Sequence, residues 1–325
     1  MQIGLFTDGL MHLPFEAALD TASRLGVQAV EIGTGNFSPA SHCDLDDLLE
    51  NASARSDFLQ HIERRQLKLA ALNCSGNPLH PKQEAAQRAI EITRKTLRLA
   101  GALGVDRVVC MSGCPGVPGG GAYPNWVVAS WPEDFLELLA WQWSECVLPF
   151  WGPMIELARA EGVAQLCFEL HPANNVYNPS SFQRLRAELG STVAANLDPS
   201  HFFFQGMDPL AVVRSLGNAI GYVHAKDARV EPYNLAVQGA LDLQPGKPVR
   251  DLVWAYRTLG YGHGELFWAD FVSALRSVGY DGVLSIEHED PLMDSEEAIG
   301  RAIRLLEKTV FFRPPSLLAG APAAF

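Results

Sequence analysis

The sequence lacks long hydrophobic runs. No window of about 18 uninterrupted apolar residues occurs, and the start, MQIGLF, has no basic region followed by an apolar stretch. A membrane-spanning helix and a secretory signal are therefore not expected. We predict a cytoplasmic protein with no membrane partner.

The chain also lacks an excess of positive charge. It contains 25 Lys and Arg against 37 Asp and Glu, which gives a formal net charge of −12 at pH 7. Nucleic-acid-binding domains normally carry a basic face. The composition therefore argues against a nucleic-acid partner, although it leaves a local basic patch open.

Clustered cysteines are missing as well. The six cysteines are scattered between Cys43 and Cys167, and three of them lie in or at the ends of apolar, strand-like runs. Scattered thiols are typical of reduced cytosolic proteins rather than of disulfide frameworks.

Short apolar runs alternate with longer segments of helical period along the whole chain. Runs rich in β-branched residues predict strands, and apolar positions that recur every three to four residues predict helices. The expected strands are 3–8, 29–33, 68–74, 107–112, 164–171, 193–198, 220–227 and 282–289. The expected helices lie near 14–25, 44–66, 83–103, 134–161, 180–189, 209–217, 268–278 and 295–310.

This alternation predicts a fold of the α/β class, a single-domain (β/α)8 TIM barrel over residues 1–312. Two connections, 113–133 and 228–267, are too long for simple loops. Both follow expected strands, so both should overhang the C-terminal mouth of the barrel as lids or substrate walls. The Pro/Ala-rich tail 313–325 has no period, and we expect it to be flexible or to rest on a neighbouring subunit, which leaves a homo-oligomer open.

Polar residues gather where the expected strands end. In a TIM barrel these ends face one pocket, so residues far apart in sequence become neighbours. Strands five to eight each supply a carboxylate or an imidazole, namely Glu169, Asp198, His224 and Glu287. An oxygen-rich set with one nitrogen suits a divalent cation such as Mn²⁺, Mg²⁺ or Co²⁺. The other strand ends carry Asp8, Glu31, Asn73, Ser112, His171, His201, Lys226, Asp227 and Glu289.

Single members of this set also have ordinary structural interpretations. A buried carboxylate at Glu169 needs a cation or a donor, and Arg184 or Arg186 could supply it. His224 could be a half-buried histidine with a backbone partner. Four ligand-type residues on successive strands favour a metal site over these alternatives.

Five segments resemble the xylose-isomerase-like barrels known as sugar phosphate isomerases and epimerases: FELHP, NLDPSHFF, YVHAKDAR, GYGHGELFW and GYDGVLSIEHED. The order and spacing of the segments match, and the resemblance is densest over 164–300. It implies that one divalent metal ion binds to Glu169, Asp198, His224 and Glu287. Mn²⁺ is the expected ion, with Mg²⁺, Co²⁺ or Zn²⁺ as alternatives.

The resemblance also implies which residues meet the substrate. The family's counterparts of His201 and Arg229 hold its hydroxyl or carbonyl oxygens. The remaining candidate substrate-binding residues are His171, Lys226, Trp126, Trp131 and Arg257. Lys226 could instead simply pair with Asp227.

Glu169 and Glu287 are the expected catalytic residues. They come from strands on opposite sides of the pocket, so they can flank a substrate carbon next to a carbonyl that the metal polarises. One would remove the proton from this carbon and the other would return one, which gives epimerisation or aldose–ketose isomerisation. Loss of a β-substituent would instead give a dehydratase or lyase acting on a keto sugar or 3-keto glycoside.

Two other functions fit the sequence less well. The apurinic-site endonucleases of the same superfamily use three zinc ions, but their extra histidines at the ends of strands three and four are replaced here by NCSGN and MSGCPG. Their Asp-x-His pair is also missing from WAYRTLGYG. A barrel that binds a sugar without catalysis would be favoured if one glutamate were replaced, but both are present.

The expected substrate is a neutral sugar or keto sugar. Barrels usually hold phosphate near the end of strand eight, where this chain has Glu287, Glu289, Asp290, Asp294, Glu296 and Glu297. These acids would repel a phosphate dianion. The long connections contain aromatic faces on which sugar rings can rest, namely Trp126, Trp131, Trp254, Tyr256 and Trp268. Core packing or a subunit interface is the alternative for each.

Overall fold

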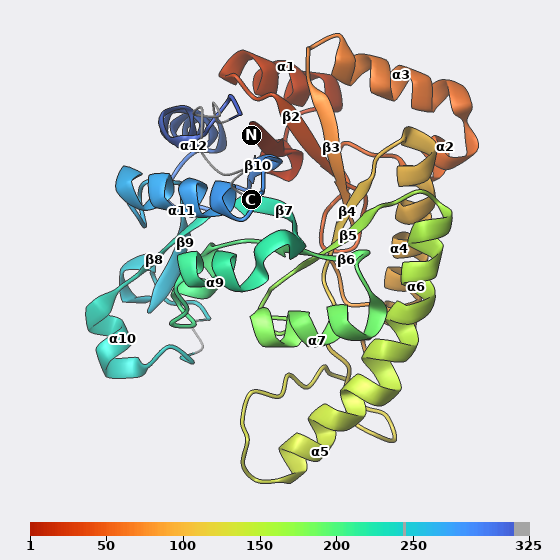
Figure 1. Cartoon of the computed structure of the whole chain (residues 1–325), viewed down its shortest axis with the longest axis vertical. Coiled ribbons are helices and arrows are strands. Elements are labelled where there is room, and N and C mark those ends of the chain that lie inside the picture. Colours follow the sequence, from red (N-terminus) through yellow and green to blue (C-terminus); the bar gives the residue numbers. More distant parts are fainter. Residues whose placement is uncertain (243–244, 315–325) are drawn as a thin grey trace, which may run out of the picture.

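The computed structural model describes residues 1–242 and 245–314 and contains a closed barrel of eight parallel strands (Figure 1). The barrel strands are β1 (Gln2–Phe6), β2 (Ala29–Gly33), β3 (Lys68–Asn73), β4 (Arg107–Cys110), β5 (Gln165–Glu169), β6 (Val193–Leu197), β7 (Ile220–Ala225) and β10 (Val283–Ile286). Their order is β1-β10-β7-β6-β5-β4-β3-β2. The predicted TIM barrel is confirmed. The expectation for the tail falls almost wholly outside the described residues.

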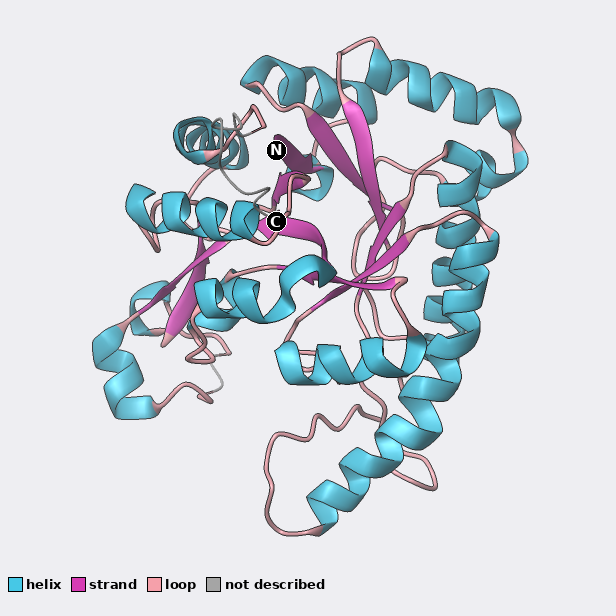
Figure 2. Ribbon diagram, viewed as in Figure 1, coloured by secondary structure: helices cyan, strands magenta, loops and turns pink. Residues whose placement is uncertain are grey.

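Helices cover the outside of the barrel (Figure 2). They are α1 (Phe15–Leu25), α2 (Leu45–Glu50), α3 (Ala52–Glu63), α4 (Gln83–Leu103), α5 (Asp134–Trp141), α6 (Leu148–Ala160), α7 (Pro179–Leu189), α8 (Ser200–Phe203), α9 (Pro209–Leu216), α10 (Pro232–Gln238), α11 (Glu265–Ser277) and α12 (Ser295–Thr309). Within the described ranges, no helix combines the length and the apolar composition needed to cross a membrane.

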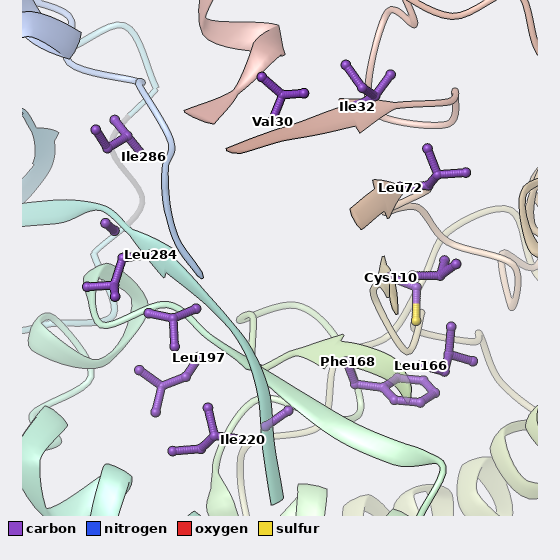
Figure 3. Packing of buried hydrophobic residues seen from close by; sticks show 14 of the residues in the cluster. Val30, Ile32, Leu72, Cys110, Leu166, Phe168, Leu197, Ile220, Leu284 and Ile286 are labelled. Carbon is purple, nitrogen blue, oxygen red and sulfur yellow. The ribbon is translucent and has the colours of Figure 1, made fainter. Parts of the chain in front are cut away.

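Successive side chains of each barrel strand point to opposite sides, so the buried residues form two separate clusters. Leu166 and Phe168 of β5 belong to the large cluster of buried apolar residues between sheet and helices (Figure 3). Cys167, which points to the opposite side of the strand, belongs to a second, smaller cluster with Tyr222 and Val283. The barrel interior is therefore filled by side chains, and this filling supports the polar residues at the strand ends.

The expected helix over 44–66 is wrong as a single element. α2 ends at Glu50, and Asn51 has an extended backbone with φ −111°. Its side-chain Oδ1 accepts hydrogen bonds from the backbone N–H groups of Ser53 and Ala54, at 3.0 and 3.2 Å. Asn51 thus caps α3, because it satisfies N–H groups that have no partner inside that helix.

The expected helix over 134–161 is continuous but irregular. A π-helical turn, η2 (Gln142–Val147), lies between α5 and α6. The side chain of Gln142 is buried there and donates to the backbone oxygens of Gly116 and Asn125, at 3.1 and 2.7 Å. The turn therefore fastens Gly116 and Asn125 of the loop 113–133 to the helix, while α5 and the loop extend away from the barrel (Figure 1).

The long connection after β7 contains structure that the sequence patterns did not indicate. The strands β8 (Asp227–Val230) and β9 (Trp254–Arg257) form an antiparallel hairpin, with α10 carried between them. Each strand has only four residues, which is too short for a clear alternation of apolar and polar positions. The hairpin brings Tyr256 back to the barrel mouth, where it lines the main cavity.

Candidate functional site

Glu169, Asp198, His224 and Glu287 come together at the C-terminal mouth of the barrel. Each offers one ligand atom, and these atoms all lie within 4.8 Å of one another. Glu169 is the last residue of β5 and His224 lies in β7. Asp198 and Glu287 directly follow β6 and β10. The structure thus brings the four predicted metal ligands into one cluster.

Two atoms of the cluster show that its donors fit a cation. Oδ2 of Asp198 and Nδ1 of His224 are buried and make no hydrogen bond of good geometry, although Oδ2 of Asp198 lies 3.1 Å from Nε2 of His201. A buried polar atom without a partner costs about 1–3 kcal/mol of stability. Nδ1 of His224 lies only 3.1 Å from Oε2 of Glu287. A divalent ion among these atoms would satisfy both of them, and it suits a set with three carboxylates and one imidazole.

His201 supplies positive charge beside this cluster. Its Nε2 donates to Oε1 of Glu169 at 2.8 Å and lies 3.1 Å from Oδ2 of Asp198. Burial lowers the pKa of His201, but these two carboxylates outweigh burial and raise it to about 9. Nδ1 bonds to the hydroxyl of Tyr256 at 3.2 Å. His201 therefore offsets part of the negative charge of Glu169 and Asp198.

Lys226 supplies a second buried cation. Its Nζ donates to Oε2 of Glu287 at 3.2 Å, contacts Glu289, and lies 4.1 Å from the ring centre of Tyr256. Burial lowers the pKa of Lys226, but the charges of Glu287 and Glu289 raise it well above its usual 10.5. The alternative pairing of Lys226 with Asp227 is wrong, because Asp227 accepts from the imidazole and backbone N–H of His263 instead.

The alternative cations for Glu169 are also excluded. The guanidinium of Arg184 lies 4.3 Å from the ring centre of Trp143. Arg186 donates to the backbone oxygens of Ser191 and Val193. Neither arginine is available to neutralise Glu169, which is paired with His201 instead.

Glu31 holds His224 from the side opposite the cluster. Its buried carboxylate accepts from Nε2 of His224 at 3.1 Å, from Nδ2 of Asn73 at 2.8 Å and from Oγ of Ser285 at 2.7 Å. A proton kept on Nε2 leaves Nδ1 facing the cluster as a ligand. The sequence placed Glu31 at a strand end but did not indicate this role, because its partners come from three other strands.

Replacing Glu31 by glutamine should weaken Mn²⁺ binding by about 10–100-fold, as is typical when the partner of a metal-binding histidine is lost. Calorimetric titration measures the affinity, and ¹⁵N NMR reports the tautomer of His224. Glu188→Gln, at an exposed position on α7, is the matched control. Unchanged affinity together with an unchanged tautomer in Glu31→Gln would contradict the role given to Glu31.

A cavity of about 680 Å³ opens above the cluster. Glu169 and Glu287 line its floor, together with Lys226, Tyr256 and the predicted substrate-binding residue His171. Among the described residues that line it, Lys226 is the one lysine or arginine, and its Nζ is already held by two carboxylates. The described lining therefore offers no unpaired lysine or arginine to a phosphate group.

The other predicted substrate-binding residues lie in different places. His201 is fully buried beneath the cavity. Four more are outside the set that lines it: Arg229 with its side chain 58% exposed, Arg257 paired with Asp290, Trp126 packed on Tyr177, and Trp131 79% exposed. Contact between these four and a substrate stays a prediction. The expected sugar platform at Trp268 is wrong, because this side chain is fully buried in α11 against Phe271.

Asp8 is a cavity residue to which sequence reasoning gave no role. Burial raises its pKa from 3.8 to about 6, a hydrogen bond with Ser38 opposes this, and the charges of Glu31 and Glu287 raise it further. The folded protein thus binds a proton here more tightly than the unfolded chain does.

Asp8 should make the metal-free protein less stable as pH rises from about 4 to about 6, because the folded state favours the protonated carboxyl. Asp8→Asn should therefore be more stable than wild type above pH 6, and the difference should vanish below pH 4. Urea unfolding of both proteins in EDTA across this range measures it. A difference that stays constant with pH would contradict the assignment.

Comparison with known proteins places this chain in a family. The family model described as "Xylose isomerase-like TIM barrel" matches residues 19–309. The chain belongs to this family. A curated relative from Bacillus subtilis (strain 168), "Uncharacterized protein YfiH", is 40% identical over 312 residues, which cover 95% of this chain and 99% of the relative.

Three solved structures share the fold of this chain. A D-tagatose 3-epimerase-like protein aligns with TM-score 0.64 at 17% identity, covering 95% of this chain and 98% of its own. The IOLI protein with a binding zinc atom gives 0.61 at 19%, covering 95% and 98%. The probable 3-DHS dehydratase AsbF of Bacillus anthracis gives 0.62 at 15%, covering 94% and 99%. At these identities the likeness shows the fold alone.

Proposed function

We propose that the protein is a divalent-metal-dependent isomerase or epimerase of a neutral sugar or keto sugar. The observation that carries the proposal is the single cluster of three carboxylates and one imidazole, in which Glu169 and Glu287 also line a cavity. Membership of the xylose isomerase-like family supports it. A structural neighbour described as D-tagatose 3-epimerase-like supports the same class of reaction.

The ion would be held by Glu169, Asp198, His224 and Glu287, and it would act as a Lewis acid that makes the C–H next to a substrate carbonyl acidic. The oxygen-rich donor set favours Mn²⁺. Zn²⁺ is the alternative, and the zinc-bound structural neighbour supports it.

Glu169 and Glu287 transfer the proton. In the metal-free protein, burial raises the pKa of Glu287, but Lys226 and His224 outweigh burial and hold it well below its usual 4.5. Glu287 is therefore ionised at neutral pH and able to accept a proton. His201 donates a hydrogen bond to Glu169 from Nε2 and orients that carboxylate for proton delivery. Delivery to the opposite face of the same carbon gives an epimer, and delivery to the neighbouring carbon gives an isomer.

The charges around the cavity support a neutral substrate. Asp8, Glu169, Glu287 and Glu289 all line it, and they are opposed by the single lysine Lys226. A phosphate dianion would meet net negative charge, whereas sugar hydroxyls can donate to these carboxylates. The sugar phosphate in the family's usual description therefore does not suit this cavity.

A second candidate function is β-elimination, as a dehydratase or lyase on a keto sugar or 3-keto glycoside. The structural neighbour described as a probable dehydratase supports it. The same two glutamates would serve, because elimination also begins with removal of the proton next to the carbonyl.

The test is a screen of ketoses, aldoses and 3-keto glycosides with the Mn²⁺-loaded protein in D₂O, followed by NMR. Deuterium next to the carbonyl with a new epimer or isomer supports the main proposal, and an unsaturated product supports the second. Protein treated with EDTA is the control. Absence of exchange in every substrate, with the metal bound and the fold intact, would overturn both.

A further inference from the structure

The loop after β2 has an unusual backbone. Gly35, Asn36 and Ala40 have positive φ angles of 137°, 65° and 52°. For a residue other than glycine, this conformation costs about 1–3 kcal/mol and persists only where the surrounding structure enforces it. Such residues concentrate at ligand-binding sites, so the side chains that this loop exposes are candidates for ligand contact.

Hydrogen bonds to the end of β3 enforce this conformation. The backbone N–H of Thr34 donates to the oxygen of Asn73 at 2.9 Å, and the N–H of Phe37 donates to the oxygen of Ser75 at 3.0 Å. Between them, Nδ2 of Asn36 donates to the oxygen of Cys74 at 2.8 Å. The first part of the loop, from Thr34 to Phe37, is therefore fastened to the end of β3, and Phe37 projects from this fixed backbone.

The loop places an apolar surface at the mouth of the cavity. Phe37 is 68% exposed and Met11 is 56% exposed, and both line the cavity beside Pro39. Exposed side chains contribute little to folding through burial, so stability does not explain a strained loop that holds Phe37 in water. Next to Phe37, Ser38 is hydrogen-bonded to Asp8 and offers polar atoms on the same wall.

The cavity is larger than a single sugar requires. At about 30 Å³ for each water-sized atom, its 680 Å³ holds roughly 23 non-hydrogen atoms, against roughly 12 in a free hexose. The reacting sugar must lie at the floor, where Glu169 and Glu287 are. The space that remains lies toward the mouth, at Phe37 and Met11.

We infer that this outer part of the cavity is a subsite for a second ring joined to the reacting sugar, so that the substrate is a glycoside or a disaccharide. The inference rests on the proposed function. The apolar face of the second ring would pack on Phe37 and Met11, and the hydroxyls near the junction would bond to Asp8 and Ser38. A glycosidic bond at the anomeric carbon of the reacting sugar keeps its ring closed. The reacting ring must therefore carry its own keto group, and the glutamates would epimerise the carbon next to that group or begin an elimination there.

The test compares three probes by calorimetric titration of the Mn²⁺-loaded protein: methyl β-D-glucopyranoside, phenyl β-D-glucopyranoside and cellobiose. We expect the wild type to bind at least one two-ring probe about tenfold more tightly than the methyl glucoside, which corresponds to roughly 1.4 kcal/mol. Phe37→Ala should remove this preference without changing the affinity for the methyl glucoside, and Phe37→Trp should retain it. Tyr233→Ala, an equally exposed aromatic position on α10 outside the cavity, should behave as wild type.

Preference for the phenyl glucoside alone would identify an apolar aglycone, and preference for cellobiose would identify a second sugar. Equal affinity for all three probes in the wild type, failure of both two-ring probes to bind, or a preference that survives in Phe37→Ala would overturn the subsite. Failure of the proposed function gives a different result: the D₂O screen shows no exchange, while the Phe37-dependent preference persists.

Discussion

Glu287→Gln should lower turnover by roughly 10²–10⁴-fold, the loss typical of a removed general acid or base. Glutamine keeps the shape of the side chain and one possible ligand oxygen, but it cannot accept the substrate proton. Lys226 would lose one of its two carboxylate partners and keep Glu289. The measurement is kcat on the substrate found in the D₂O screen, with the metal content of each variant determined.

Glu169→Gln should cause a loss of similar size, but the two variants need not fail at the same step. The variant that still exchanges the substrate proton with D₂O but forms no product lacks the residue that returns the proton. Glu307→Gln, at an exposed position on α12, is the matched control. A metal-loaded double glutamine variant that turns over at the wild-type rate would refute the proton-transfer mechanism.

Removal of the metal should abolish turnover and lower the melting temperature. We expect one divalent ion per chain, bound by the folded protein and not by the unfolded chain. An ion present at 1,000 times its Kd then stabilises the fold by about 4.1 kcal/mol. Elemental analysis and thermal unfolding, with and without EDTA, measure the stoichiometry and the stabilisation.

The Asp198→Asn variant distinguishes the loss of metal binding from the loss of local structure. Oδ1 of Asp198 accepts from the backbone N–H of Ser200 at 2.8 Å, and asparagine retains that bond. Oδ2, which lies 3.1 Å from Nε2 of His201, is the atom whose charge is removed. The variant should fold but gain no stability from Mn²⁺. Two or three ions per wild-type chain would contradict the single site and would indicate that His201 is a ligand, as in the endonuclease-like alternative.

The four clustered residues were predictable from sequence because barrel topology alone makes neighbours of strand ends. No side-chain detail is needed to place Glu169 beside Asp198 once β5 and β6 are recognised. The role of Glu31 was not predictable, because it depends on the register that sets His224 of β7 and Ser285 of β10 against one carboxylate of β2.

The loops were less predictable than the strands. Phe37 and Asp8 meet the cavity through positive φ angles and a hydrogen bond between two loops, which leave no periodic pattern in the sequence. The aromatic residues of the long connections were assigned to the cavity by composition alone. Tyr256 lines it because a hairpin returns there, whereas Trp268 packs in the core.

The π-helical turn at Gln142 has a consequence for engineering. Its side chain bonds to Gly116 and Asn125, and the N–H of Asn125 bonds to the oxygen of Pro115 at 2.9 Å. The residues between Gly116 and Asn125 therefore form a loop whose two ends are held together by these hydrogen bonds. Segments of other lengths and compositions should therefore be exchangeable between these anchors without altering the strands that carry the metal ligands.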